Sequence, residues 1–171
     1  MFREMRRKGQ ILPLEKSIEI LKSSTSGVLA LLGDDGYPYS VPMSYVYDGE
    51  KIYFHSAPEG HKVDAVRREA KASFCVVAED NVMPEKYTTA YRSVIAFGKI
   101  HIIEDPAEKR AAIEKLGKKY APAHSGLKAE IDSFFNHFCM MCFEPEHITG
   151  KEAIEYVRMR KSQSGYENKY Y

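Results

Sequence analysis

The sequence of 171 residues lacks an excess of either charge, because 25 lysines and arginines are balanced by 24 acidic residues. A general nucleic-acid binder usually presents a strongly basic face, which this balance does not predict. No apolar stretch approaches the ~20 residues that span a bilayer. The basic N-terminus also lacks the apolar segment of a secretory signal. We therefore expect a cytoplasmic protein whose partners are neither nucleic acids nor membranes.

Cysteine is scarce as well, and the odd count of Cys75, Cys139 and Cys142 is typical of free thiols in a chain that folds without disulfides. Cys139 and Cys142 have the spacing of half a zinc site, but no second pair accompanies them. On a strand the two side chains would point to opposite faces, which favours thiols packed in the core. The six histidines show no HxxxH or HxH spacing. The sequence therefore predicts no metal site.

Hydrophobic residues make up 44% of the chain, which is enough for a packed core and predicts one domain over residues 1–160 with a polar tail over 161–171. Apolar runs bounded by turn residues predict strands at 27–32, 37–47, 51–55, 72–77, 88–103 and 135–143. Helical patterns are expected at 14–23, 61–68, from Asp105, within 127–133, and from a capping box at 149–152. Six strands in mostly hairpin order, with short helices between them, favour a small antiparallel barrel of the mainly-β class.

The segment from His55 to Lys62 offers the clearest chemistry. A strand ends, a loop containing proline and glycine follows, and a helix begins with His61 and Lys62 in its first turn. Cations there oppose the helix dipole at a cost of ~0.3–1 kcal/mol each. A bound anion would reverse that effect, and phosphate is the usual one. The alternative is that both cations are solvated and screened by Asp64.

Seven short stretches together resemble one known family, although each alone is modest. They are MRRK at 5–8, GYPYSVP at 36–42, IYFHSA at 52–57, GHKVD at 60–64, YRSV at 91–94, EKR at 108–110 and HITGKEA at 147–153. In this order the chain to about residue 158 resembles the pyridoxamine 5'-phosphate oxidase-like flavoproteins, specifically their nitroimidazole-resistance branch. The resemblance implies a six-stranded FMN-binding split β-barrel with short peripheral helices. It also implies a homodimer with FMN held at the subunit interface.

The resemblance also implies which residues contact the cofactor. Beside the flavin ring it assigns Val41, Pro42, Met43 and Ser44, mainly through backbone. Along the ribityl-phosphate side it assigns His55, Ser56 and Ala57, with His61 and Lys62 at the phosphate. Ser93 would lie near the flavin. In many relatives a polar residue at this position reaches the flavin bound by the partner subunit. No proton donor is assigned, and the catalytic candidates are His55, Tyr91 and Arg92, each of which also has a plain structural role available.

The function implied is that of an FMN-dependent oxidoreductase. It would pass electrons from NAD(P)H to a small flat acceptor such as a nitroaromatic, a nitroimidazole for example, or a quinone-like compound. A true pyridoxamine phosphate oxidase carries an arginine where this chain has Tyr39 and Ser40, and it ends in a motif containing tryptophan. This chain has no tryptophan, so oxidation of vitamin B6 is not expected. The alternative is a non-catalytic storage or sensor protein that binds flavin or haem, with His55, His61 or His137 as an axial ligand.

Overall fold

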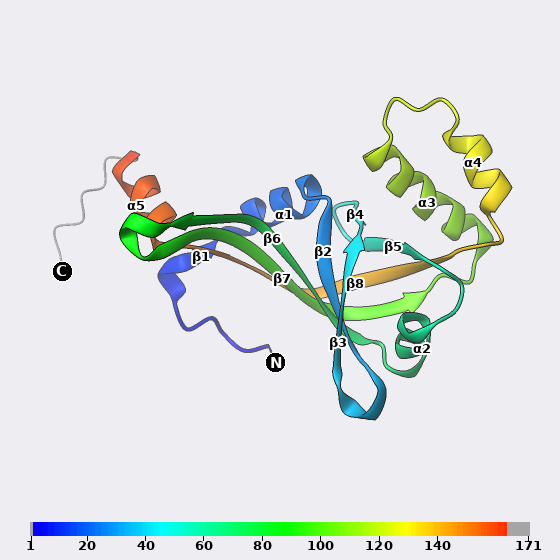
Figure 1. Ribbon diagram of the computed structural model, residues 1–171, viewed down its shortest axis with the longest axis horizontal. Helices are drawn as coiled ribbons and strands as arrows, with labels where there is room; N and C mark the ends of the chain where they lie inside the picture. Colours follow the sequence, from blue (N-terminus) through cyan, green and yellow to red (C-terminus); the bar gives the residue numbers. More distant parts are fainter. Residues whose placement is uncertain (1, 164–171) are drawn as a thin grey trace.

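The computed structural model describes residues 2–163, which form an antiparallel sheet of eight strands flanked by helices (Figure 1). The sheet follows the order β3-β2-β6-β7-β8-β5-β4, and β1 pairs with β8. The strands are β1 (Ile11–Leu12), β2 (Ser26–Leu32), β3 (Pro38–Ser44), β4 (Val46–Tyr47), β5 (Ile52–Ser56), β6 (Lys71–Met83), β7 (Thr88–Ile102) and β8 (Cys139–Glu152). The mainly-β class is therefore confirmed, with eight strands where six were expected.

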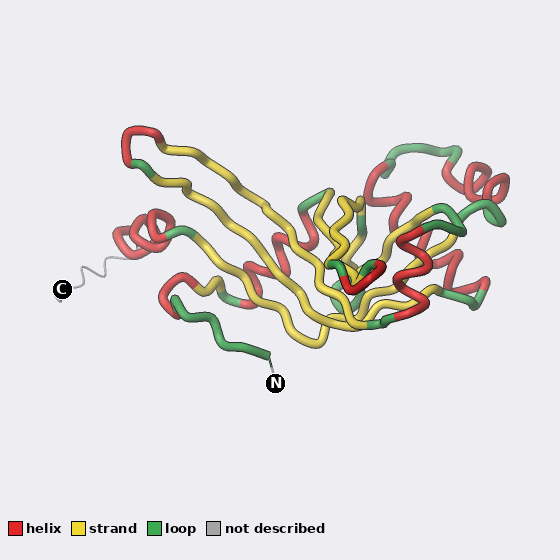
Figure 2. The backbone as a smooth tube through the Cα atoms, turned by 60° about the horizontal axis from the view of Figure 1, so that its bottom comes forward, coloured by secondary structure: helices red, strands yellow, loops and turns green. Residues whose placement is uncertain are grey.

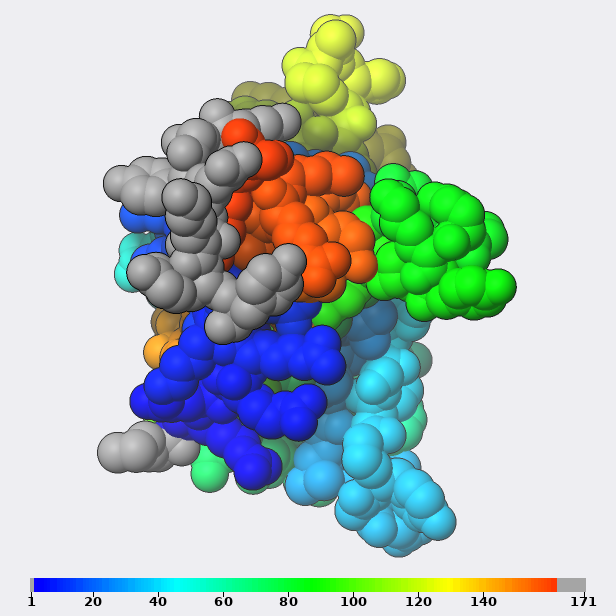
Figure 3. Space-filling view, turned by 90° about the vertical axis from the view of Figure 1, so that its left-hand side faces the viewer, coloured from blue at the N-terminus to red at the C-terminus, as the bar shows by residue number. Residues whose placement is uncertain are grey.

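Helices lie at both ends of the long strands β6, β7 and β8 (Figure 1). They are α1 (Leu14–Ser23), α2 (His61–Arg68), α3 (Pro106–Tyr120), α4 (Leu127–Phe134) and α5 (Ile154–Gln163), with short 3-10 turns η1 (Lys8–Gln10), η2 (Asp34–Gly36) and η3 (Pro84–Lys86). The β6–β7 hairpin extends well beyond the rest of the sheet (Figure 2). Its tip lies beside α5 in the end-on view of Figure 3, and the N-terminal segment lies below α5. No helix within residues 2–163 is long and apolar enough to cross a membrane.

Two helices begin where their local sequence predicts. The Asp105 side chain caps α3 by accepting a hydrogen bond from the Glu108 N–H at 2.7 Å, and Pro106 occupies the first helical position. Gly60 has φ +113°, a conformation that side chains disfavour, and this turn lets α2 start directly at His61. The expected helix at 61–68 is confirmed at both ends.

The last strand and helix differ from the prediction. Residues 135–138 form the turn that follows α4, and β8 begins only at Cys139. Residues 149–152, predicted as the capped start of a helix, instead form the last rungs of β8 opposite residues 92–95 of β7. Four paired residues satisfy more backbone groups than one local cap does, so the sheet prevails over the capping motif. α5 begins at Ile154, and it extends to Gln163 through the start of the predicted polar tail, whose remaining residues lie outside the described part.

A bulge bends the long β7–β8 pair at Gly98. The register shifts between Phe97 and Gly98, because β8 contributes one extra residue there. A side chain at position 98 would collide with the Glu144 carbonyl, which explains glycine at this position. The bend allows the sheet to curve around its core.

The core has two parts. The larger lies inside the curved sheet, where Tyr45, Phe54 and Phe74 are fully buried and meet edge to face. The smaller lies between α3 and the outer face of β5 and β8, and it includes Tyr53, Met140 and Cys142. The free thiol expected in the core is therefore Cys142, while the Cys139 sulfur lies 3.3 Å from the Ala57 carbonyl oxygen.

Candidate functional site

The junction between β5 and α2 brings together the polar groups of the 55–62 segment. His55 pairs with Met140 of β8 and keeps its ring exposed, whereas Ser56 is buried opposite Cys139. Residues 57–60 then turn the chain into α2. The first N–H groups of a helix have no partner within it and carry the positive end of its dipole. This junction therefore offers donors and positive potential at one point of the surface.

Lys62 is the feature that distinguishes this helix start from an ordinary one. Its side chain is half-buried, and its ammonium lies 3.3 Å from the Met43 sulfur, which is a weak acceptor. Within residues 2–163 no carboxylate lies at ion-pair distance from it. Burial lowers the pKa of Lys62 because the charged form loses water without gaining a counter-ion. A bound anion would supply that counter-ion.

Two further cations share the surroundings of the Cys139 thiol with Lys62. Burial raises the pKa of the Cys139 thiol. Three positive charges lower it, those of Lys62, Lys109 and Arg67. Lys109 comes from α3 and donates to the carbonyl oxygens of Phe135 and Phe138 at 2.7 and 2.6 Å. A cavity of about 280 Å³ beside the 57–60 loop is lined by both Arg67 and Lys109. Neither residue was identified from the sequence: Arg67 lies in the last turn of α2, beyond the 55–62 segment, and Lys109 comes from α3.

His61 lies on the other side of the helix start, against the β2–β3 turn. Its ring stacks on Tyr39, with centroids 4.1 Å apart and 18° between the planes. Its Nε2 lies 3.5 Å from an Asp34 oxygen, and Arg68 donates to the other oxygen of Asp34 at 2.8 Å. The hydrogen bond from Arg68 is the largest factor that holds the pKa of Asp34 below its ordinary value. His61 is thus already oriented by protein groups, whereas Lys62 is not.

The predicted ring-side residues form the edge strand β3, which pairs with β2 on one side only. Along it Val41 is half-buried, Met43 is buried, and Pro42 and Ser44 are exposed. The contact between Met43 and Lys62 joins this strand to α2. The structure therefore brings the 41–44 and 55–62 segments, distant in sequence, to one side of the molecule.

The three predicted residues of β7 lie elsewhere. Ser93 is half-buried opposite Val77, and β3 is three strand positions away from β7, which corresponds to ~14 Å at the usual strand spacing. The Arg92 guanidinium contacts Glu79 at 2.6 Å and Glu152 at 3.5 Å, and it stacks over the Tyr156 ring. Arg92 is therefore held by a charge network. Along β8, Ser93 lies opposite Lys151 whereas His55 lies opposite Met140, so a single subunit does not bring these β7 residues to the His55–Lys62 group.

The family of the chain follows from a comparison with family models. Residues 13–152 match the family model described as pyridoxamine 5'-phosphate oxidase. The chain belongs to this family. The matched residues include β3, β5 and α2, so the elements that form the candidate site lie within the part of the chain that the family model covers. No curated protein matches the sequence.

Solved structures share this fold over most of its length. A conserved hypothetical protein from Mycobacterium tuberculosis, Rv2991, is 21% identical with a TM-score of 0.74, covering 98% of this chain and 97% of its own. A proposed 5-nitroimidazole antibiotic resistance protein from Bacteroides thetaiotaomicron is 22% identical with a TM-score of 0.70, covering 83% and 86%. A FAD- and haem-binding protein from Mycobacterium smegmatis is 20% identical with a TM-score of 0.70, covering 89% and 80%. At these identities the likeness establishes the shared fold.

Proposed function

We propose that this protein is an FMN-dependent oxidoreductase of the pyridoxamine 5'-phosphate oxidase family. It would transfer electrons from NAD(P)H to a small flat acceptor, a nitroaromatic such as a nitroimidazole or a quinone-like compound. The similarity to a proposed nitroimidazole resistance protein supports this acceptor class. The three free thiols support a cytoplasmic location.

The observation that carries the proposal is the half-buried Lys62 at the start of α2, which has no carboxylate partner in the part of the chain that the structure describes. A desolvated cation costs free energy unless an anion accompanies it. The helix N-terminus, the Ser56 hydroxyl and the Lys62 ammonium together offer the donors that a phosphate monoester needs. The FMN phosphate fits this donor set.

When bound, FMN supplies the redox chemistry, and the protein residues hold and surround it. Lys62 and the first α2 amides would neutralise the phosphate, and His55 would lie along the ribityl chain. Residues 41–44 would flank the ring, with Ser44 an exposed residue and no N–H donor at Pro42. We assign no catalytic proton donor, because the charge network of Arg92 already explains that residue.

We further propose that the protein works as a homodimer. The outer face of β2, β6 and β7 carries Val28, Val77, Ile95 and Phe97, all of them substantially exposed. A contiguous exposed apolar patch of this kind is typical of an interaction surface. Ser93 lies on the same face, beside Val77 and Ile95. Pairing of two copies through this face would let Ser93 reach the cofactor site of the partner subunit.

The dimer is tested by light scattering of the purified protein. Val77→Glu and Ile95→Glu should each lower the measured molar mass from that of two chains to that of one. Each substitution places a carboxylate that dimer formation would have to bury without a partner. Leu14→Glu on α1 is the control, since Leu14 is also exposed but lies away from this face. A monomeric wild-type protein would contradict the proposal.

The cofactor and the reaction are tested by the absorption spectrum of the freshly purified protein. We expect flavin bands, release of FMN on denaturation, and bleaching when NADH or NADPH is added without oxygen. Addition of a nitroimidazole or a quinone should restore the colour. A flavin reduced only by dithionite would overturn the enzymatic part of the proposal and favour storage or sensing.

Haem binding is the second candidate, because the similar Mycobacterium smegmatis protein is described as binding both FAD and haem. His55, His61 and His137 are exposed enough to act as axial ligands. The spectrum separates the two cofactors: a Soret band without flavin bands would replace FMN by haem.

A further inference from the structure

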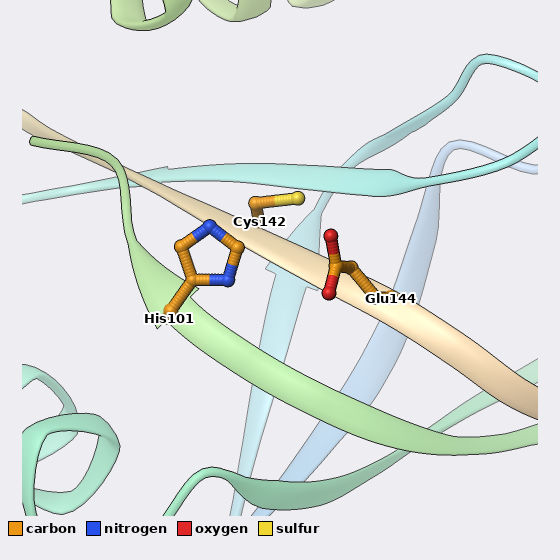
Figure 4. Close-up of side chains that lie close together, drawn as sticks. All are labelled: His101, Cys142 and Glu144. Atoms are coloured by element: carbon orange, nitrogen blue, oxygen red, sulfur yellow. The ribbon is translucent and has the colours of Figure 1, made fainter. Parts of the chain in front are cut away.

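A second group of ligating side chains lies outside the α2 site, on the outer face of β7 and β8. His101 comes from β7, and Cys142 and Glu144 come from β8. One ligand atom from each lies within 4.8 Å of those from the other two. Figure 4 shows the imidazole, the thiol and the carboxylate on the same side of the strand pair, with the Glu144 carboxylate turned toward the other two.

The sheet itself sets this arrangement. His101 and Cys142 are direct partners in the antiparallel register, which brings their Cβ atoms to ~4.5–5.5 Å. Glu144 follows Cys142 by two residues, so it projects from the same face of the strand. The three groups are therefore held by regular backbone pairing rather than by a flexible loop.

We propose that His101, Cys142 and Glu144 bind a divalent cation of the zinc class, with the remaining coordination position open to water. Thiolate, imidazole and carboxylate are the three ligand types that zinc uses in proteins, and three protein ligands are typical of its open sites. Magnesium and calcium prefer oxygen ligands alone, so the sulfur selects against them.

Burial gives the three ligands different access to solvent. Cys142 is fully buried beside Met140 and Tyr53, whereas His101 and Glu144 are exposed. A cation would thus enter from the His101 and Glu144 side and close on the sulfur from outside the core. The thiolate is the form of cysteine that binds a metal ion, so cation binding would displace the proton of the Cys142 thiol.

One existing contact competes with the cation. The Lys51 ammonium lies 3.0 Å from a Glu144 carboxylate oxygen. A bound cation must replace this ammonium or share the carboxylate with it, and the two positive charges repel each other. Lys51→Met should therefore raise zinc affinity, an effect opposite in sign to loss of a ligand.

The test uses zinc alone, added to the full-length protein and measured by competition with a chromophoric chelator. We expect one zinc per chain, and an X-ray absorption signature of one sulfur at about 2.3 Å with nitrogen or oxygen at about 2.0–2.1 Å. Both readouts work whether or not a flavin is bound, and neither depends on activity. Binding without sulfur in the coordination shell would overturn the proposal.

Variants identify the ligands. His101→Gln and Glu144→Gln change exposed side chains and should leave the fold intact, while lowering zinc affinity by about 100-fold or more, since loss of a supporting residue alone costs 10–100-fold. Cys142→Ser should remove the sulfur signal. The matched controls are His124→Gln and Cys75→Ser, which should leave affinity unchanged. Equal affinity in wild type and His101→Gln would refute the site, even if Cys142→Ser fails to fold.

Discussion

Replacement of Lys62 by methionine tests the anion site directly. Methionine keeps most of the side-chain volume and removes the charge. In the flavin-free protein the ammonium is half-buried, and its acceptor among the described residues is the Met43 sulfur. Its removal should leave the unfolding free energy of that form unchanged or increased, because a desolvated cation is lost together with a weak contact.

The cost should appear only when a phosphate is bound. A hydrogen bond to a charged group contributes ~1.5–3 kcal/mol, and each 1.4 kcal/mol is tenfold in affinity. FMN should therefore bind Lys62→Met about 10- to 150-fold more weakly. Riboflavin has the same ring and ribityl chain without the phosphate, so its affinity should stay within about twofold, well under the ~1.5 kcal/mol effect of a lost charged hydrogen bond.

Quenching of flavin fluorescence during titration of the flavin-free protein measures both ligands. Lys86→Met in the η3 turn is the control, because this exposed lysine lies at the distant tip of the β6–β7 hairpin. Unchanged FMN affinity in Lys62→Met would mean that the phosphate binds elsewhere. An equal loss for FMN and riboflavin would mean that Lys62 acts on the ring or on the shape of the site.

Three further predictions concern stability and charge. Gly98→Ala should destabilise the protein by ~1–3 kcal/mol in urea unfolding, because its methyl group meets a backbone carbonyl at the bulge, whereas Gly9→Ala has open space and should cost far less. Glu152→Ala should cost ~2–3 kcal/mol, since it leaves two guanidinium groups without the buried carboxylate, while exposed Glu146→Ala should stay within ~0.5 kcal/mol. Partial burial and then the neighbouring Lys62 ammonium lower the pKa of His55 in the folded protein. As the pH decreases below about 6.5 the unfolded chain takes up this proton first, so the stability that His55 contributes falls. An NMR titration of the folded protein should give a His55 pKa below 6.5, and a higher pKa would contradict this reasoning.

Local chemistry predicted the elements whose ends depend on neighbouring residues. α2 follows Gly60, and α3 follows Asp105 and begins at Pro106, as expected from turn and capping preferences. The same reasoning failed at Thr149–Glu152, where a capping motif is present but the chain continues as β8. The difference is that β7 supplies a backbone partner for each of these residues, and no pattern within 149–152 reveals that neighbour.

The candidate site divides in the same way. The 55–62 segment is continuous, so a strand end, a glycine turn and a helix start could be recognised in it. Among residues 2–163 no carboxylate pairs with Lys62, and Arg67 and Lys109 act on the same Cys139 thiol as Lys62. Both facts depend on how α2, α3 and β8 pack together. Arg92 seemed available for chemistry, but packing surrounds it with Glu79 and Glu152.

The sequence by itself determined the class of the fold, the start of α2 and the stretch of chain that we propose as the phosphate site, because each depends on residues close together along the chain. Only the tertiary structure decided which charges form ion pairs and which of the proposed metal ligands lie close together. His101 is 41 positions from Cys142 in sequence, and no spacing rule joins them. The antiparallel register of β7 and β8 makes them neighbours, because hydrogen-bonded strands align residues by pairing and not by distance along the chain.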